Sequence, residues 1–284
     1  MIRFLKINPI DSIDNQCLVR SFRSKHLAFT ITGSNQPHYS DFTLFTAFCR
    51  LPKYIRGQFI VHTSSFKMHI LLVAATPFEI APTIAWLETH FQQSSEGVFE
   101  KENLQVQILV TGVGMTATAF QLGHYLAQHR PDWILNAGIA GAFDPSLNLG
   151  DVVQIVSERF GDLGVEEADG RFTDMAELGF MPQTMFPNPQ SPIPNLRSCA
   201  GLTVNKVHGA ASSIEKIQEK YPEAQVESME GVAFFYACLA AGVPFIEIRS
   251  ISNRVEPRNR DAWDLPLAIR ELNEVLVGIL EAIA

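Results

Sequence analysis

Two short segments near the end of the chain carry side chains suited to binding a nucleoside. Glu227-Ser228-Met229-Glu230 offers carboxylates that can accept hydrogen bonds from sugar hydroxyls, and the segment from Arg249 to Asn253 ends in an amide. An Asn side chain both donates and accepts hydrogen bonds, whereas an ionised Asp only accepts and would repel a carbonyl oxygen on the base. Asn253 therefore favours a 6-oxopurine such as hypoxanthine over adenine.

Two glycine-containing turns follow apolar segments and could bring a ligand close to the backbone. Gly112 and Gly114 precede a helix expected to begin at Met115, and the second turn, which contains Ala140 and Gly141, ends another expected strand. Neither turn carries the full dinucleotide or phosphate-loop pattern, so each is equally typical of a tight strand-to-helix connection. We expect both at the edge where the strands of open α/β sheets end and ligands bind.

Glu79 and Glu230 each stand at the start of an expected helix. A carboxylate in this position is stabilised by the helix dipole and needs no further role, which is the simpler explanation for Glu79 taken alone. Glu230 has Met229 beside it, and the following strand returns Arg249 and Asn253 to a neighbouring edge of the sheet. These residues together, more than either carboxylate alone, indicate a ligand-binding site.

Strands alternate with helices from Met68 onward, which predicts an α/β fold: a single three-layer α/β/α domain with a mostly parallel central mixed sheet. Residues 158–164 are expected to form a loop beside the site, and the Pro-rich residues 181–194 a surface excursion. The expected strands are 69–75, 104–111, 133–136, 151–157 and 244–251, and the expected helices are 78–92, 115–129, 213–220, 230–241 and 264–283.

Composition divides the chain into two unlike parts. Residues 1–67 contain 9 Lys and Arg against 3 Asp and Glu, although the whole chain of 284 residues has a net charge of -8. We expect residues 1–67 to be a poorly ordered extension, including sequence upstream of the natural start codon, and residues 68–284 to be the catalytic domain. The acidic balance disfavours nucleic acid as a partner, because that binding depends on Lys and Arg. A small-molecule nucleoside fits better.

Cysteine spacing and hydropathy bound the setting of the protein. The 4 Cys have no CxxC spacing, so neither a zinc site nor a disulfide framework is indicated, and a reducing cytoplasm is the expected location. The longest apolar run, residues 232–246, is interrupted by Gly242 and Pro244 and is too short to span a membrane. We expect no membrane association, no metal and no organic cofactor.

Several blocks in order carry a family resemblance over residues 68 to 284. The blocks are MHILLVAATPFE, TGVGMTATA, LNAGIAGAF, LGDVV, ESMEGVAF and VPFIEIRSISN. They resemble the superfamily of purine nucleoside phosphorylases and methylthioadenosine/adenosylhomocysteine nucleosidases and, within it, the futalosine hydrolases. The resemblance implies release of hypoxanthine from futalosine on a menaquinone route, and a homodimer.

The resemblance also implies a role for individual residues. Glu79 matches the carboxylate that deprotonates the attacking water, Glu230 the residue that binds the ribose hydroxyls, and Met229 the residue packed against the sugar. Arg249 matches a basic residue near the water, and Trp263 an aromatic wall of the pocket. Asn253 stands where adenine-specific nucleosidases have an Asp that protonates N7.

Base stacking is one departure from the nucleosidase pattern. Val207 stands where the nucleosidases have an aromatic ring that stacks on the base. Phe160 is a candidate replacement by its location alone.

The resemblance favours hydrolysis over phosphorolysis. The superfamily's phosphorylases bind phosphate with Arg and Ser, whereas this chain has Asn136 and Ile139 in the matching region and no Arg in residues 76–79. A carboxylate at Glu79 would repel phosphate but can act as a base toward water. Two alternatives remain: a methylthioadenosine/adenosylhomocysteine nucleosidase, and a catalytically silent nucleoside-binding or storage protein.

Overall fold

The computed structural model describes residues 67–284, and the predictions made for residues 1–66 lie outside them. The strands are β1 (Met68–Ala74), β2 (Gln92–Ser95), β3 (Val98–Lys101), β4 (Leu104–Val110), β5 (Trp133–Ala142), β6 (Val152–Phe160), β7 (Gly164–Glu166), β8 (Phe172–Asp174), β9 (Met185–Pro187), β10 (Arg197–Thr203), β11 (Val226–Ser228) and β12 (Phe245–Arg254). The helices are α1 (Pro77–His90), α2 (Met115–Leu126), α3 (Ala211–Lys220), α4 (Gly231–Ala241), the 3₁₀ helix η1 (Arg260–Ala262) and α5 (Leu265–Ile283).

A mixed sheet runs through the middle of the described residues in the order β11-β10-β6-β12-β5-β1-β4-β3-β2. The pairs that β1 forms with β4 and β5, and that β12 forms with β5, are parallel, whereas β12 pairs with β6 in the antiparallel sense. β11 pairs both with β10 and with β5, so one end of the sheet closes on itself. This closure was not predicted from the sequence.

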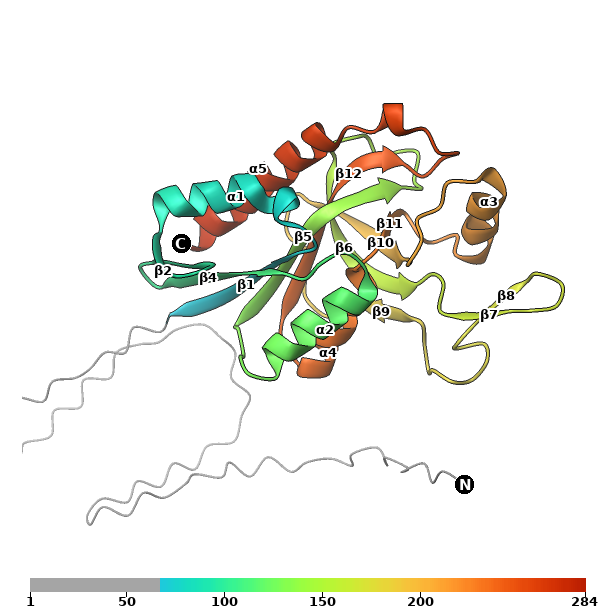
Figure 1. Ribbon diagram of the computed structural model, residues 1–284, viewed down its shortest axis with the longest axis horizontal. Helices are drawn as coiled ribbons and strands as arrows, with labels where there is room; N and C mark the ends of the chain where they lie inside the picture. The colour runs from blue at the N-terminus through green and yellow to red at the C-terminus, as the bar shows by residue number, and fades with distance from the viewer. Residues whose placement is uncertain (1–66) are drawn as a thin grey trace, which may run out of the picture. The chain divides into compact units, whose positions relative to one another are not determined.

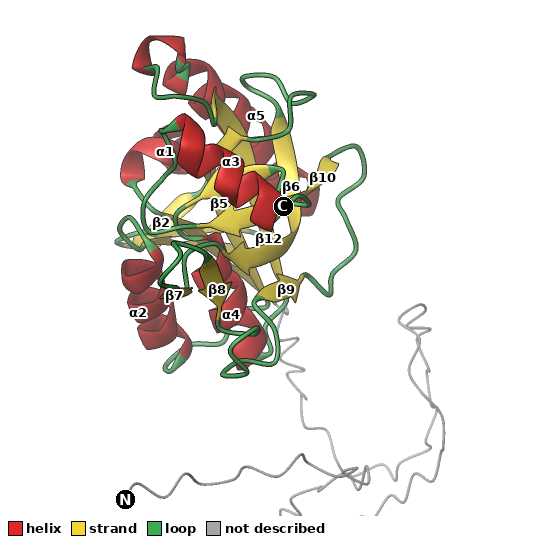
Figure 2. Ribbon diagram, turned by 90° about the vertical axis from the view of Figure 1, so that its right-hand side faces the viewer, coloured by secondary structure: helices red, strands yellow, loops and turns green. Residues whose placement is uncertain are grey.

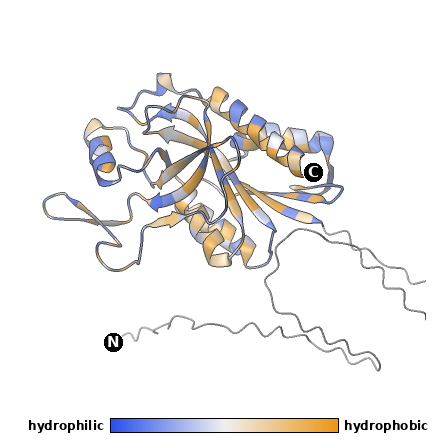
Figure 3. Cartoon of the chain, turned by 180° about the vertical axis from the view of Figure 1, so that it is seen from behind, coloured by the Kyte–Doolittle hydropathy of each residue, from blue (hydrophilic) through white to orange (hydrophobic). Residues whose placement is uncertain are grey.

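Helices cover both faces of the sheet, which confirms the α/β fold (Figure 1). On one face, α1 and α5 pack through Ile80, Leu87, Leu272 and neighbouring apolar side chains onto β1. On the other face, α2 and α4 pack against each other, and α4 contacts β6, β10 and β12 (Figure 2). The strands at the centre carry mostly apolar residues, so burial between two helical layers accounts for their continuous hydrophobic runs (Figure 3).

Several expected boundaries were wrong. The two strands that line the site, β5 and β6, run to Ala142 and Phe160, well past the expected ends. Residues 158–160 are therefore in a strand, which corrects the predicted loop over 158–164. The hairpin of β2 and β3 and the strand β10 were not anticipated; β2 has the sequence QQSS and is exposed at every position, so it shows no apolar alternation.

Candidate active site

Glu79 is held at the start of α1 with both of its oxygens engaged. Oε2 accepts hydrogen bonds from the backbone N–H and the hydroxyl of Thr76, each at 2.9 Å, which is the reciprocal pairing of a capping box. Oε1 accepts the backbone N–H of Ile139 at 3.2 Å. The carboxylate is only 8% exposed, so it is not the solvated helix-end residue of the simpler explanation.

Glu230 occupies the N-cap position of α4 but does not cap that helix with its side chain. Oε1 instead accepts the backbone N–H of Gly114 at 2.9 Å, across 116 residues of sequence. Gly114 has a φ of 94°, a conformation that strongly favours glycine, so the turn before α2 is shaped to direct this N–H at the carboxylate. Burial raises the pKa of the Glu230 carboxyl, and Arg249 and the Gly114 N–H offset only part of that rise.

The side chain of Arg249, on β12, is 2% exposed and lies near the carboxylates of Glu79 and Glu230. A Cβ placed on Gly138 would lie 2.9 Å from Arg249 Nη1 and 2.9 Å from Glu79 Oε1, so these two side chains converge on the space that the glycine leaves. Burial works against the charge on Arg249, but Glu247, Glu230 and Glu79 together raise the pKa of the guanidinium above its ordinary value. Glu79, Glu230 and Arg249 therefore form one charged cluster.

Asn253 is placed by an irregularity in β12. The pairing of β12 with β5 shifts between Ile251 and Asn253, so the chain bulges at Ser252. The Ser252 hydroxyl donates to Asn253 Oδ1 at 2.8 Å, and Asn253 Nδ2 donates to the carbonyl of Arg254 at 2.9 Å. These two bonds orient the amide and leave one N–H and one oxygen lone pair available to a ligand.

Two buried carboxyl groups beside this cluster were missed in the sequence. Glu158 on β6 and Glu247 on β12 are both 0% exposed, and Glu247 Oε1 lies 3.0 Å from Arg249 Nη2. A signal for Glu247 was present, because an acidic residue in the otherwise apolar run VPFIEI is unusual in a buried strand. Glu158 gave no such signal, since it lies in a polar stretch.

Comparison with known proteins places the chain in a family. The sequence model of the phosphorylase superfamily matches residues 69–191 and 207–283. The chain belongs to the phosphorylase superfamily. Within this superfamily it is similar to the futalosine hydrolase of Streptomyces coelicolor, at 35% identity over 192 residues that cover 62% of this chain and 80% of that protein.

Two further comparisons also find similarity to futalosine hydrolases. The futalosine hydrolase of Acidothermus cellulolyticus is 31% identical over 227 residues, covering 75% of this chain and 89% of that protein. The native structure of futalosine hydrolase of Helicobacter pylori strain 26695 aligns with a TM-score of 0.62 at 16% identity, covering 76% of this chain and 98% of that chain. The structural likeness concerns the fold.

The remaining site residues expected from the superfamily resemblance lie on elements around the charged cluster. Ala140 and Gly141 stand near the end of β5; Ala140 accepts a hydrogen bond from the Ser252 hydroxyl, and a Cβ on Gly141 would lie 3.0 Å from Asn253 Nδ2. Met229 is half-buried beside Glu230. The backbone N–H of Asp264 donates to the Ser252 carbonyl, which brings the residue after Trp263 against the residue before Asn253.

The ring of Trp263 itself is covered on one face by the Arg258 guanidinium, 5.0 Å from the ring centroid. Val207 packs at the margin of a separate apolar cluster around Leu202 and Ile214. The expected roles of Trp263, Val207 and Phe160 toward the base stay predictions.

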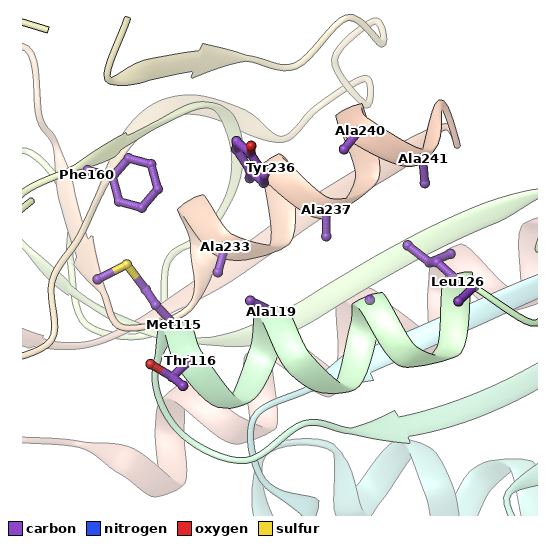
Figure 4. Close-up of a pocket in the computed structure, with 12 residues that line it drawn as sticks. Met115, Thr116, Ala119, Leu126, Phe160, Ala233, Tyr236, Ala237, Ala240 and Ala241 are labelled. Atoms are coloured by element: carbon purple, nitrogen blue, oxygen red, sulfur yellow. The ribbon is translucent and has the colours of Figure 1, made fainter. Parts of the chain in front are cut away.

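A groove of about 630 Å³ lies between α2 and α4, next to this site (Figure 4). Phe160, Met115 and Tyr236 line it, together with small side chains of both helices. None of the four polar residues Glu79, Glu230, Arg249 and Asn253 is among its lining residues. The groove begins one residue after Gly114, whose N–H holds Glu230.

Between residues 67 and 284, no group of three or more His, Cys, Asp or Glu side chains is arranged to hold a metal ion. Within the same range no helix has the length and hydropathy needed to cross a membrane.

Proposed function

We propose that this protein hydrolyses the N-glycosidic bond of futalosine and releases hypoxanthine. The observation that carries the proposal is the oriented amide of Asn253, which keeps one N–H free to donate to O6 or N7 of a 6-oxopurine. Similarity to two futalosine hydrolases supports the same substrate. The product would enter a menaquinone route, as the family resemblance implies.

The charged cluster suits the chemistry of this bond. Loss of the base passes through a cation-like ribosyl group, so the site must favour positive charge on the sugar and negative charge on the departing base. Glu230 would accept hydrogen bonds from the ribose hydroxyls, with Met229 packed against the sugar. Glu79 would take a proton from water as that water attacks the anomeric carbon, and Asn253 would donate to the base without transferring a proton.

Water is the better nucleophile for this site than phosphate. Glu79 is buried and close to Glu230, so a phosphate dianion would meet two carboxylates, and the nearby guanidinium of Arg249 is already paired with Glu247 at 3.0 Å. A carboxylate, in contrast, is a competent base toward water.

A substrate panel tests the proposal. Futalosine, inosine and methylthioadenosine are incubated with the enzyme, with and without phosphate, and the released bases and sugars are separated by liquid chromatography. We expect hypoxanthine from futalosine at a rate independent of phosphate. Release of adenine from methylthioadenosine would favour the methylthioadenosine/adenosylhomocysteine nucleosidase alternative, a sugar phosphate would indicate phosphorolysis, and binding without turnover would indicate a silent nucleoside-binding protein.

We further infer a cytoplasmic homodimer. The exposed aromatic side chains Phe120 on α2 and Tyr236 on α4, which are 68% and 54% exposed, lie on the face of the molecule that carries the groove. An apolar face of this kind is typical of an association surface. Cys199 and Cys238 are both free, which is compatible with a reducing compartment.

A further inference from the structure

Glu158 and Glu247 meet in a space that two glycines leave open. A Cβ on Gly231 would lie 2.2 Å from Glu158 Oε1 and 2.8 Å from Glu247 Oε1, so the two oxygens face the same point. A Cβ on Gly201 would lie 2.1 Å from Glu158 Oε1. Any larger residue at either position would collide with the Glu158 carboxyl group, so the backbone is shaped around this pair.

The hydrogen bonds of the pair are incomplete in a specific way. Glu158 Oε2 accepts from the Thr203 hydroxyl at 2.7 Å, and the Thr203 oxygen in turn accepts the Val232 N–H at 2.8 Å. Glu158 Oε1 has no well-aligned hydrogen-bond donor among the described residues, and the Glu247 carboxylate meets only the Arg249 guanidinium, at 3.0 Å, and the Asn136 amide. A buried acceptor without a donor is destabilising, and a carboxyl proton would supply the missing donor.

The charges around the pair also indicate that one of the two carboxyl groups is protonated. The titratable groups facing the pair are Arg249 on the same strand as Glu247, Glu230 at the start of α4, and the Cys238 thiol on α4. Asn136 on β5 and Thr203 on β10 contribute only neutral groups. Among the described residues, Arg249 is the single cation facing this pair, and it already faces Glu79, Glu230 and Glu247, so an ionised Glu158 would add a buried negative charge that no cation offsets.

We propose that Glu158 and Glu247 share one proton, carried by Glu158, and that this pair is a positioning device that holds Arg249 against Glu79. Burial raises the pKa of Glu247 to about 7, and Arg249, whose Nη2 lies 3.0 Å from Glu247 Oε1, offsets part of that rise, whereas Glu158 has no cation paired with it. Burial, followed by the charge of Glu247, raises the pKa of Glu158 well above its ordinary value, in agreement with this assignment. The positioning role rests on the proposed function; the shared proton does not.

The proton is tested directly by difference infrared spectroscopy of protein labelled with ¹³C in its Glu carboxyl groups. At neutral pH we expect a C=O band from a protonated carboxyl group that is lost in Glu158→Gln. Glu227→Gln, which removes a different buried and labelled carboxyl group, on β11, should retain the band and serves as the control. Absence of the band in the unmodified protein, or its survival in folded Glu158→Gln, would overturn the proposal whatever the substrate is.

Glu247→Gln provides a second variant if Glu158→Gln does not fold. Removing the neighbouring negative charge lowers the pKa of Glu158, so the C=O band should disappear at a lower pH than in the unmodified protein. A band with an unchanged titration contradicts a shared proton.

Kinetics of futalosine hydrolysis test the positioning role. Glu158→Gln replaces a protonated carboxyl by a neutral amide, so kcat at neutral pH should fall by less than about tenfold, the scale of one hydrogen bond. Glu247→Gln removes the partner of Arg249 and should lower kcat by about 100-fold with little change in KM, as expected when reacting groups are displaced by about 1 Å. Equal losses in the two variants would contradict the assignment of the proton to Glu158.

The pH dependence has a defined sign. As pH rises through the raised pKa of Glu158, the unmodified enzyme gains a negative charge under Arg249, and kcat/KM should decline. The amide of Glu158→Gln cannot lose a proton, so this alkaline decline should be absent from its profile. A variant that lowers activity while keeping the shape of the profile would indicate a merely structural role.

Discussion

The part of the site that we propose to bind the sugar, here called the sugar side, and the part that we propose to bind the base, the base side, are built in different ways. Glu79 and Glu230 accept backbone N–H groups that are 60 and 116 residues away in the sequence, so their positions depend on the assembled sheet. Asn253 is oriented by Ser252 and Arg254, its immediate neighbours, at a bulge in one strand. The first region is rigid because several elements hold it, whereas the second depends on a local arrangement.

This difference separates the reaction from the choice of substrate. In the proposed function, the carboxylates and Arg249 would form a preorganised charged environment for a cation-like ribosyl group, which any purine nucleoside would present. The base would be selected by the amide of Asn253, whose donors and acceptors can be exchanged without disturbing the sheet. Substitutions on the sugar side should therefore change the rate for every substrate, and those on the base side should change preference.

The largest effect is expected from Glu79→Gln. The Gln side chain can still complete the capping box with Thr76, so α1 should form normally. Loss of a general base typically costs 10² to 10⁴ in rate, and we expect kcat to fall by about 1000-fold with little change in KM. Hypoxanthine release under saturating futalosine measures it.

Glu88→Gln is the matched control, because Glu88 is exposed on the same helix and loses the same charge. Its kcat should equal that of the unmodified enzyme. Unchanged turnover in Glu79→Gln would show that another group activates the water, and the catalytic role proposed for the sugar side would be wrong.

The parts of the fold that were predictable are those that local periodicity describes. β1, α1 and α5 lie close to their expected positions because β1 is a continuous apolar run buried on both faces of the sheet, and α1 and α5 each bury an apolar face against the sheet. The closure of the sheet through β11 and β5 was not predictable, since a three-residue strand with the sequence VES carries no periodic pattern. Pairing over such distances is a property of the assembled sheet.

The site shows the same division. Glu79, Glu230, Arg249 and Asn253 could be proposed from the sequence because the family blocks contain them, and their roles stay predictions. Glu158 and Glu247 approach each other because β6 and β12 both run past Gly231 at the start of α4, and such an assembly of distant segments cannot be deduced from one sequence. Gly201 and Gly231, which make room for Glu158, carried no separate signal for the same reason.

Gly138→Ala should have the next largest effect and tests how rigid the sugar side is. The added Cβ would lie 2.9 Å from both Arg249 Nη1 and Glu79 Oε1, and both side chains are enclosed. Displacement of about 1 Å can cost 10²-fold, so we expect kcat to fall by about 100-fold for futalosine and inosine alike.

Gly278→Ala is the control, because no atom lies within 4 Å of its new Cβ. Its activity should be unchanged, and its melting temperature should not fall, since Ala is the better residue inside a helix. Full activity in Gly138→Ala would mean that Arg249 and Glu79 can separate freely, which would remove the contrast between the two sides.

Asn253→Asp should have the smallest effect on rate and the clearest effect on preference. The carboxylate can still accept the Ser252 hydroxyl, but it loses the Nδ2 donor to the Arg254 carbonyl and would repel O6 of hypoxanthine. An unsatisfied polar contact costs about 1 to 2 kcal/mol here, so kcat/KM for futalosine should fall roughly tenfold. Methylthioadenosine should become a better substrate, because its 6-amino group donates to a carboxylate.

Asn103→Asp is the control, because it introduces the same charge at an exposed position, and it should leave the ratio of kcat/KM for the two substrates unaltered. If Asn253→Asp lowers both activities equally, the amide of Asn253 supports the strand and does not select the base. The proposed difference between the sugar side and the base side would then be wrong.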